Sequence, residues 1–163
     1  MEHKTHQENV EKLRELIKDI DFAMLTTVHA DGSLRSRPMS TQEAEFDGDL
    51  WFLTSADTAK AYEIRQDSRV NVSYAQPDDQ RYVSVSGTAA LLNDRAKIDE
   101  FWTPAYKIFF PDGKDDPNLR LIKITVDKAE YWDSKGLIPT VIAFAQAMLG
   151  KESETGVNEK INL

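Results

Sequence analysis

The apolar residues follow a helical period at the start of the chain and form a nearly continuous run near its end. Around residues 8–20 they recur at three- and four-residue spacing, which predicts an amphipathic N-terminal helix. The members of this apolar face are Val10, Leu13, Leu16, Ile17 and Ile20. Residues 140–149 form a second, largely apolar segment, and we expect a C-terminal helix there that packs against protein.

Between these helices, short segments with β-forming residues are separated by turn residues, which predicts strands. The segments cover residues 22–29, 34–40, 50–54, 69–76, 81–92 and 119–132. Gly87 lies inside one long segment and predicts a bulge or bend, and a second bend is expected at residues 127–128. Shorter helices are predicted at residues 59–66 and from residues 93–94 to 102.

The predicted strands follow one another with few interruptions, so we expect six antiparallel strands in largely sequential order. Closure into a barrel, or nearly so, would remove exposed sheet edges, and a β-sandwich is the alternative. Residues 152–163 are interpreted as a polar tail that ends in an apolar pair, Ile161 and Leu163. Because the 163 residues contain no linker or repeat, a single domain over residues 1–163 is predicted, mainly β with peripheral helices.

Composition and net charge narrow the partners and the compartment. The formal net charge is −8, whereas proteins that bind nucleic acid need a basic face for the phosphate backbone. No apolar run reaches the roughly 20 residues of a membrane span, and residues 1–12 lack the apolar core of a secretory signal. Cysteine is absent, which excludes disulfides and thiolate chemistry. We therefore expect a cytoplasmic protein with neither a nucleic-acid nor a membrane partner.

Two arginines on one predicted strand are candidates for binding an anion. Arg35 and Arg37 are two residues apart, so on a strand both side chains leave the same face. Pro38 removes a backbone donor, which edge strands and bulges tolerate. A flat ring along residues 38–40 could take hydrogen bonds from the main chain while Arg37 faces an anionic oxygen. A solvated strand face is the alternative interpretation.

Lys60 is a second candidate, because it lies in the first turn of the helix predicted at residues 59–66. The helix dipole disfavours a cation there unless an anion is nearby. Thr54, Ser55 and Thr58 add hydroxyl groups at the same helix start, where free backbone N–H groups bind phosphate. A surface lysine beside a capped helix is the alternative. We predict a phosphate-bearing ligand at this place.

Motifs for several other chemistries are missing from the sequence. No zinc-binding histidine spacing, nucleophile elbow, P-loop or G-x-G-x-x-G segment occurs. We therefore expect no metal site, no P-loop chemistry and no hydrolysis by a nucleophile, and no residue is predicted to be catalytic. Trp132 stands at the end of the last predicted strand segment and could cover a ring from across a subunit interface.

Three segments together resemble a known family. They are RSRPMS at residues 35–40, WFLTS at residues 51–55 with Lys60 after it, and FPDGKDDPNLRLIKITVDKAEYWD at residues 110–133. The chain resembles the pyridoxamine-phosphate-oxidase-like FMN-binding split barrels over nearly its whole length, and within them the general stress protein 26 group. The resemblance implies a six-stranded split β-barrel, a homodimer and FMN at the dimer interface.

The resemblance also implies roles for individual residues. Residues 37–40 would line the isoalloxazine ring, and the arginine among them would also reach toward the phosphate. Residues 53–55 would hold the ring and the ribityl phosphate, and Lys60 would bind the phosphate. Tyr82 would contact the flavin, and Trp132 would reach the flavin of the partner subunit. The full set of expected cofactor contacts is Arg37, Pro38, Met39, Ser40, Leu53, Thr54, Ser55, Thr58, Lys60, Tyr82 and Trp132.

Three departures from the family concern the substrate. The vitamer oxidases carry a lysine and an arginine where this chain has Gln42 and Ala59, and residues 136–138 lack their Arg-x-His motif. Pyridoxamine-phosphate oxidation is therefore disfavoured. The resemblance implies FMN, with FAD as the alternative, in an oxidoreductase of unidentified substrate that takes electrons from NAD(P)H or another small redox partner. A non-enzymatic flavin-binding stress protein is the alternative function, and a haem or deazaflavin barrel has no specific support.

Overall fold

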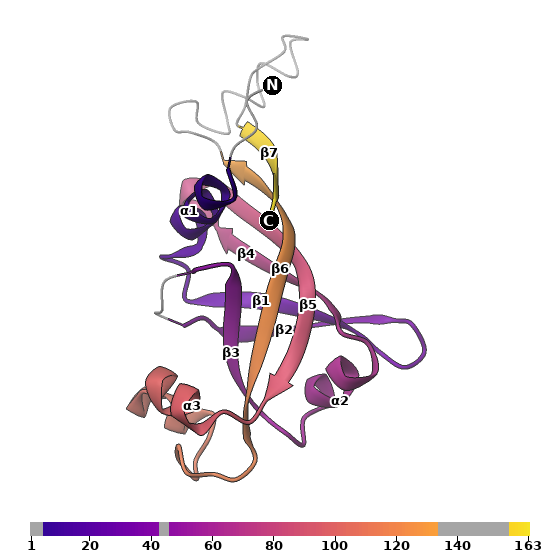
Figure 1. Ribbon diagram of the computed structural model, residues 1–163, viewed down its shortest axis with the longest axis vertical. Coiled ribbons are helices and arrows are strands. Elements are labelled where there is room, and N and C mark those ends of the chain that lie inside the picture. The colour runs from indigo at the N-terminus through magenta and orange to yellow at the C-terminus, as the bar shows by residue number, and fades with distance from the viewer. Residues whose placement is uncertain (1–4, 43–45, 134–156) are drawn as a thin grey trace.

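The computed structural model describes residues 5–42, 46–133 and 157–163 (Figure 1). The helices are α1 (His6–Ile17), α2 (Ala59–Gln66) and α3 (Arg95–Phe101), with 3₁₀ turns η1 (Pro77–Asp79) and η2 (Pro104–Ile108). The strands are β1 (Phe22–Val28), β2 (Leu34–Ser40), β3 (Asp49–Ser55), β4 (Arg69–Gln76), β5 (Arg81–Leu92), β6 (Leu119–Asp133) and β7 (Val157–Asn162). The fold is mainly β with peripheral helices, as predicted. The helix predicted at residues 140–149 lies outside the described residues.

Helix α1 begins earlier than the apolar period alone predicts, because a polar pair caps it. The Thr5 hydroxyl accepts a hydrogen bond from the Glu8 N–H, and the Glu8 carboxylate accepts one from the Thr5 N–H. The apolar face behind this cap is buried. Asn9 on the helix donates from its side-chain amide to the Asn162 carbonyl at 2.8 Å, which ties α1 to β7 at one end of the sheet (Figure 1).

The sheet order is β2-β1-β4-β5-β6-β3, with β7 also paired to β6. The expected sequential order holds for the β1–β2 hairpin and for β4, β5 and β6, but it is wrong for β3. That strand pairs with β6 from Asp49 opposite Thr125 to Ser55 opposite Leu119. The apolar run of β3 suits this position, because Leu50, Phe52 and Leu53 are buried there.

The sheet curls into a barrel without closing, which is the split-barrel fold. Strands β2 and β3 are its two ends, and they approach each other without pairing. Each end strand therefore has one side whose backbone groups have no sheet partner. The candidate site described below lies in this opening.

The strands β5 and β6 bend together at a bulge. Their register shifts between Ser86 and Gly87, which leaves Asp127 of β6 without a partner in β5. A Cβ atom at Gly87 would lie only 2.2 Å from the Thr125 carbonyl oxygen, so the strands can approach this closely only because the residue is glycine. The bends predicted at these two places are confirmed.

The interpretation of residues 152–163 as a polar tail is wrong for its last part. Strand β7 pairs antiparallel with β6, and Ile161 lies opposite Ala129 with only 3% of its surface exposed. The Tyr131 hydroxyl donates to the Glu159 carboxylate at 2.8 Å. A short polar segment forms a strand here because β6 continues beyond the end of β3 and offers it a free edge.

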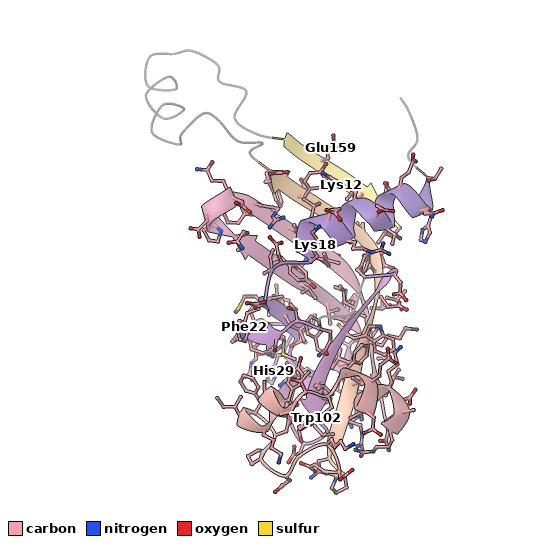
Figure 2. All side chains as sticks on the ribbon, turned by 90° about the vertical axis from the view of Figure 1, so that its left-hand side faces the viewer. Lys12, Lys18, Phe22, His29, Trp102 and Glu159 are labelled. Carbon is pink, nitrogen blue, oxygen red and sulfur yellow. The ribbon has the colours of Figure 1, made fainter. Side chains whose placement is uncertain are left out.

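The buried apolar residues form two clusters. The larger one lies between α1 and the sheet. The smaller one packs η2 and α3 against β3 and β6 through Leu53, Ile98, Phe101, Tyr106, Leu119 and Leu121. Figure 2 shows Trp102 at this end of the molecule, opposite Lys12 and Lys18 on α1. The smaller cluster thereby holds η2 and the loop after it beside the opening between β2 and β3.

Candidate functional site

A cavity of about 410 Å³ lies between the two end strands of the sheet. Strand β2 contributes residues 38–40, β3 contributes residues 53–55, and α2 contributes Lys60 and its N-cap Thr58. The remaining lining residues are Phe22, Tyr106, Phe109, Phe110, Pro111 and Asp116. The open side of the split barrel is therefore a pocket with walls from β2, β3, α2 and the η2 segment.

The polar end of this cavity is the start of α2. Thr58 caps the helix, since its hydroxyl accepts from the Ala61 N–H at 3.4 Å and donates to the Ser55 carbonyl at 2.9 Å. The first turn carries no acidic residue, so the positive end of the helix dipole is not compensated there. Among the described residues, no carboxylate lies within ion-pair distance of the half-buried Lys60. The helix start can therefore receive an anion.

The charge of Lys60 is shaped by two features of its surroundings. Burial, followed by the nearby charge of Arg37, lowers the pKa of Lys60 below its ordinary value of 10.5. Both effects disfavour the charged amine. An anion bound beside the amine would act in the opposite direction and restore its proton affinity. A bound anion would therefore favour the charged form of Lys60, which lines this cavity.

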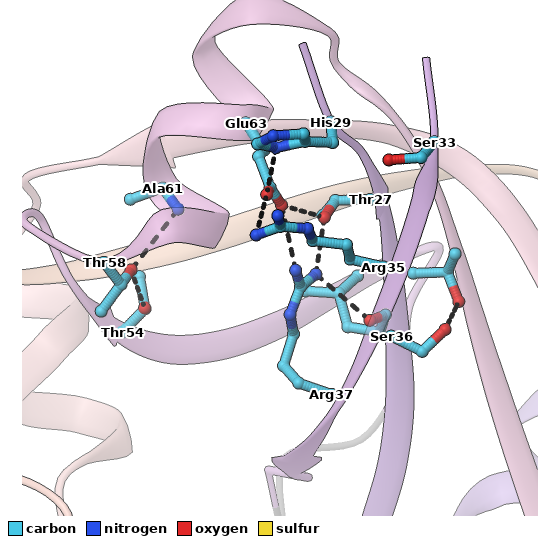
Figure 3. A network of polar contacts seen from close by, with 12 residues as sticks. Thr27, His29, Ser33, Arg35, Ser36, Arg37, Thr54, Thr58, Ala61 and Glu63 are labelled. Atoms are coloured by element: carbon cyan, nitrogen blue, oxygen red, sulfur yellow. Dashed lines mark hydrogen bonds and ion pairs between the residues drawn. The ribbon is translucent and has the colours of Figure 1, made fainter. Parts of the chain in front are cut away.

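Helix α2 also carries a buried carboxylate, Glu63, which is 2% exposed (Figure 3). One oxygen, Oε2, accepts hydrogen bonds from the Thr27 hydroxyl at 2.5 Å and from Arg37 Nη2 at 3.0 Å. The other oxygen lies 3.1 Å from His29 Nδ1 and 3.6 Å from Arg35 Nη1. These residues form the Glu63 network, which joins β1, β2 and α2 through one buried charge.

Arg37 uses only part of its guanidinium in this network. Nη1 donates to the Thr27 hydroxyl at 2.6 Å and to the Leu25 carbonyl at 3.3 Å, while Nη2 donates once, to Glu63. A guanidinium has five N–H donors, so the Nε–H and the second Nη2 N–H remain. These two lie on the same edge of the planar group, and that edge matches two oxygens of a phosphate.

The opposite part of the cavity lining is largely aromatic. Phe22 and Phe109 remain 58% and 57% exposed, which is high for phenylalanine, while Tyr106 is buried in the smaller core cluster. Phe22 pairs with Ser40, three residues from Arg37 along β2, or about 10 Å of strand. The cavity therefore has a cationic end and a flat apolar end.

The match to known proteins agrees with this architecture. A model of the family described as pyridoxamine 5'-phosphate oxidase like matches residues 8–155 of the chain. The chain belongs to this family. Because the matched range contains β2, β3, α2 and the segment from Tyr106 to Asp116, the whole cavity lies inside it.

Three members or relatives of the pyridoxamine 5'-phosphate oxidase-like family illustrate the similarity. Protein bli-3 of Neurospora crassa is 30% identical over 139 residues, 78% of this chain and 66% of that protein. General stress protein 26 of Bacillus subtilis is 35% identical over 74 residues, 44% of this chain and 52% of that protein. The chain thus spans slightly less than two thirds of the first relative and about half of the second. The general stress FMN/FAD binding protein from Xanthomonas citri has a TM-score of 0.69 at 30% identity, covering 82% of this chain and 94% of that one.

These comparisons confirm the predicted family and its general stress protein 26 group, and the structure brings most predicted contacts together. Eight of the eleven line the cavity: Pro38, Met39, Ser40, Leu53, Thr54, Ser55, Thr58 and Lys60. Arg37 is not in the lining and is held by Glu63 instead. Tyr82 and Trp132 pair with each other on the outer face of the sheet. The binding roles of all eleven residues stay predictions.

The sequence analysis did not predict two parts of this candidate site. One is the aromatic wall between Tyr106 and Phe110, for which the cluster of aromatic residues just before Pro111 was the available signal. The other is Glu63, which lies between the buried residues Ala61 and Ile64 on a short helix. An acidic residue among buried positions of a helix indicates a specific partner.

A second cavity, of about 290 Å³, lies between α1 and the β2–β3 region. Its lining includes Arg14, Lys18, Gln42 and Trp51, but none of the eleven predicted contacts.

Within the described ranges, no group of three or more His, Asp or Glu residues could hold a metal ion. No helix in the described part of the chain is long and apolar enough to cross a membrane. The cavity between β2 and β3 is therefore the candidate site.

Acid is expected to weaken the Glu63 network. Burial raises the pKa of Glu63, but the hydrogen bonds that its carboxylate accepts outweigh this effect and hold the pKa below its ordinary 4.5. A group with a lowered folded-state pKa stabilises the fold above its unfolded pKa, and this contribution is lost as the pH falls through the folded pKa. The free energy of unfolding should fall as the pH drops below 4.5, and less steeply in Glu63→Gln. Urea titrations of both proteins over this range measure the difference, and parallel curves would contradict it.

Proposed function

We propose that the protein is a flavin-binding protein of the general stress type that holds FMN in the cavity between β2 and β3. The observation that carries the proposal is the division of this cavity into a cationic end at Lys60 and a flat apolar end near Phe22. FMN has the matching shape, with an anionic phosphate at one end and a planar ring at the other. The family of the chain supports the proposal, as does its similarity to an FMN/FAD binding protein.

Different residues of the chain would contact the phosphate, the ring and the ribityl chain of FMN. The Lys60 amine, the free N–H groups at the start of α2 and the open edge of Arg37 would hold the phosphate. Residues 38–40 and Leu53 would lie along the ring, where Pro38 leaves the backbone open to a ligand. Thr54 and Thr58, whose hydroxyls lie 3.3 Å apart, would face the ribityl chain. FMN, and not FAD, is the proposed occupant.

FMN would supply hydride and electron transfer at its ring, and the protein would bind and orient it. We infer an oxidoreductase of unidentified substrate that takes electrons from NADH, NADPH or another small donor in the cytoplasm. A non-enzymatic flavin-binding role is the second candidate. It is favoured by the residues at the positions where vitamer oxidases carry a lysine and an arginine, because Gln42 and Ala59 have no charge to hold a substrate phosphate.

The proposal predicts a yellow protein with flavin absorption bands after purification or after addition of FMN. Mass spectrometry of the extracted cofactor identifies FMN or FAD. Bleaching of the flavin when the loaded protein meets NADH or NADPH without oxygen would support the oxidoreductase, whereas no bleaching with either donor would favour the non-enzymatic role. A colourless protein that does not respond to added FMN would refute both.

We also propose that the protein is a homodimer that buries the outer face of the sheet. Phe22 and Met24 of β1 remain 58% and 41% exposed on this face, and Tyr82 and Trp132 remain 43% and 41% exposed. Tyr82 and Trp132 are direct neighbours across β5 and β6. Exposed apolar residues gathered on one sheet face are typical of an interface. This arrangement would bring Trp132 to the partner's flavin.

A charge placed in this face is expected to separate the subunits. Met24→Asp would bury an unpaired carboxylate in the interface, so the variant should be monomeric at micromolar concentration. Ile108→Asp is the matched control, because Ile108 is 79% exposed on η2, outside the sheet. Light scattering of the wild type and both variants gives the answer. A wild-type monomer, or a Met24→Asp dimer as tight as the wild type, would refute this interface.

A further inference from the structure

Glu63 is a charged group buried where the fold alone does not require one. It is 2% exposed and lies on α2 between Ala61 and Ile64, which are buried as well. An unpaired carboxylate in such a place would be strongly destabilising. All its partners come from other elements, Thr27 and His29 at the end of β1 and the two arginines of β2. The carboxylate thus fixes the position of β2 relative to α2.

Glu63 stands one helical turn after Lys60, and residues three apart lie on neighbouring parts of a helix surface. One short helix therefore carries the cation that lines the cavity and the anion that holds Arg37. Arg37 is close enough for its charge to act on the Lys60 amine. Lys60 and Arg37 consequently belong to the same electrostatic site, although only Lys60 lines the cavity.

The hydrogen bonds of Arg37 decide which of its edges is offered to a ligand. Thr27 and Glu63 occupy the end of the guanidinium formed by Nη1 and Nη2, and Leu25 takes the remaining Nη1 proton. The edge with Nε–H and the second Nη2 proton has no partner within the described chain. A free arginine would have to be ordered on binding, whereas here the guanidinium is already held.

We propose that Glu63 is a positioning residue that holds Arg37 with its Nε edge turned toward the anion site, so that the cavity selects phosphorylated over unphosphorylated flavin. This inference rests on the proposed function. Glu63 contributes through Arg37 and does not itself touch the ligand.

Substitutions of Glu63 separate position from charge. Glu63→Ala removes the carboxylate from all its partners and leaves Arg37 held only through Nη1, by Thr27 and the Leu25 carbonyl. Glu63→Gln keeps the shape, because the amide oxygen can accept from Thr27 and Arg37 while its NH₂ group donates to the ring nitrogen of His29. Glu63→Asp, shorter by one methylene group, withdraws the carboxylate from Arg37 and serves if the alanine variant does not fold.

The measurement is the ratio of the dissociation constants of riboflavin and FMN, obtained from quenching of flavin fluorescence on the full chain. The two ligands differ only in the phosphate, so a general loss of stability would change both constants and leave their ratio in place. We expect the ratio to fall roughly tenfold in Glu63→Ala, as for loss of one hydrogen bond to a charged group. Glu63→Gln should stay within about threefold of the wild type, and Glu63→Asp should lie between them.

Arg37→Ala provides the test that Glu63 acts through the arginine. This variant should lower the ratio by itself, and adding Glu63→Ala to it should cause little further change. An unchanged ratio in Glu63→Ala, an equal fall in Glu63→Gln, or fully additive effects in the double variant would each overturn the inference. If the wild type binds neither flavin, the proposed function fails. If it prefers FMN and Glu63→Ala prefers it equally, only the positioning role fails.

Discussion

Lys60→Ala is expected to weaken FMN binding by roughly 10- to 100-fold, which corresponds to the loss of about 1.5–3 kcal/mol for a hydrogen bond to a charged group. Lys60 lies at the uncompensated N-terminus of α2 and, among the described residues, has no ion-pair partner. The phosphate of FMN would oppose the two effects that lower the pKa of this amine, which are burial and the charge of Arg37. Riboflavin, which lacks the phosphate, should lose much less affinity in the same variant.

Titration of the purified variant with FMN and with riboflavin measures both effects. Lys114→Ala is the matched control, because it removes the same charge from an exposed loop outside the cavity lining, where Lys114 faces Asp99 at 3.7 Å. Lys60→Arg should retain part of the FMN affinity. If Lys60→Ala bound FMN as tightly as Lys114→Ala, the assignment of the phosphate to this helix start would be wrong.

Gly87→Ala is expected to destabilise the fold by roughly 3 kcal/mol, because the strands must move apart to admit one methyl group. The new Cβ atom would lie 2.2 Å from the Thr125 carbonyl oxygen, which is backbone and cannot rotate away. A loss of this size should lower the melting temperature by roughly 6–12 °C for a domain of this length.

Thermal unfolding followed by circular dichroism tests this expectation. Thr88→Ala is the control, since Thr88 is the next residue of β5 and is exposed. It changes a side chain beside the bulge without entering the space between the strands. A melting temperature for Gly87→Ala within about 2 °C of the control would contradict the prediction. It would mean that β5 and β6 can separate with little loss of free energy, unlike most sites where an extra methyl group is forced into a packed core.

Local alternation and turn residues were enough to predict most strands, because each of those segments carries its own pattern. The placement of β3 was different. Its apolar run in residues 50–54 says that the strand is buried, but not which edge receives it, and the partner in β6 begins more than sixty residues later. Strand β7 was not predicted for a related reason. Ile161 is buried because β7 pairs with the free edge of β6, and residues 157–162 carry no strand pattern of their own.

In the candidate site too, features set by neighbouring residues could be predicted, whereas contacts between residues far apart in the sequence could not. The helix start at Lys60 and the backbone around Pro38 could be interpreted from neighbouring residues. The Glu63 network could not, because its members are brought together over separations of 26 to 36 residues. Arg37 illustrates the result. It was expected at the ring and the phosphate, whereas its position is set by a carboxylate that no pattern near it revealed.

Because β2 and β3 do not pair, the stability of the folded protein in a cell should depend on the ligand that binds between them. Unpaired strand edges invite association with other chains, and a molecule that bridges the two strands would cover them. Any ligand that binds only the folded state raises the free energy of unfolding as its concentration exceeds the dissociation constant. The amount of intact protein in a cell should therefore follow the supply of the cofactor, with the empty barrel the form most exposed to aggregation and proteolysis.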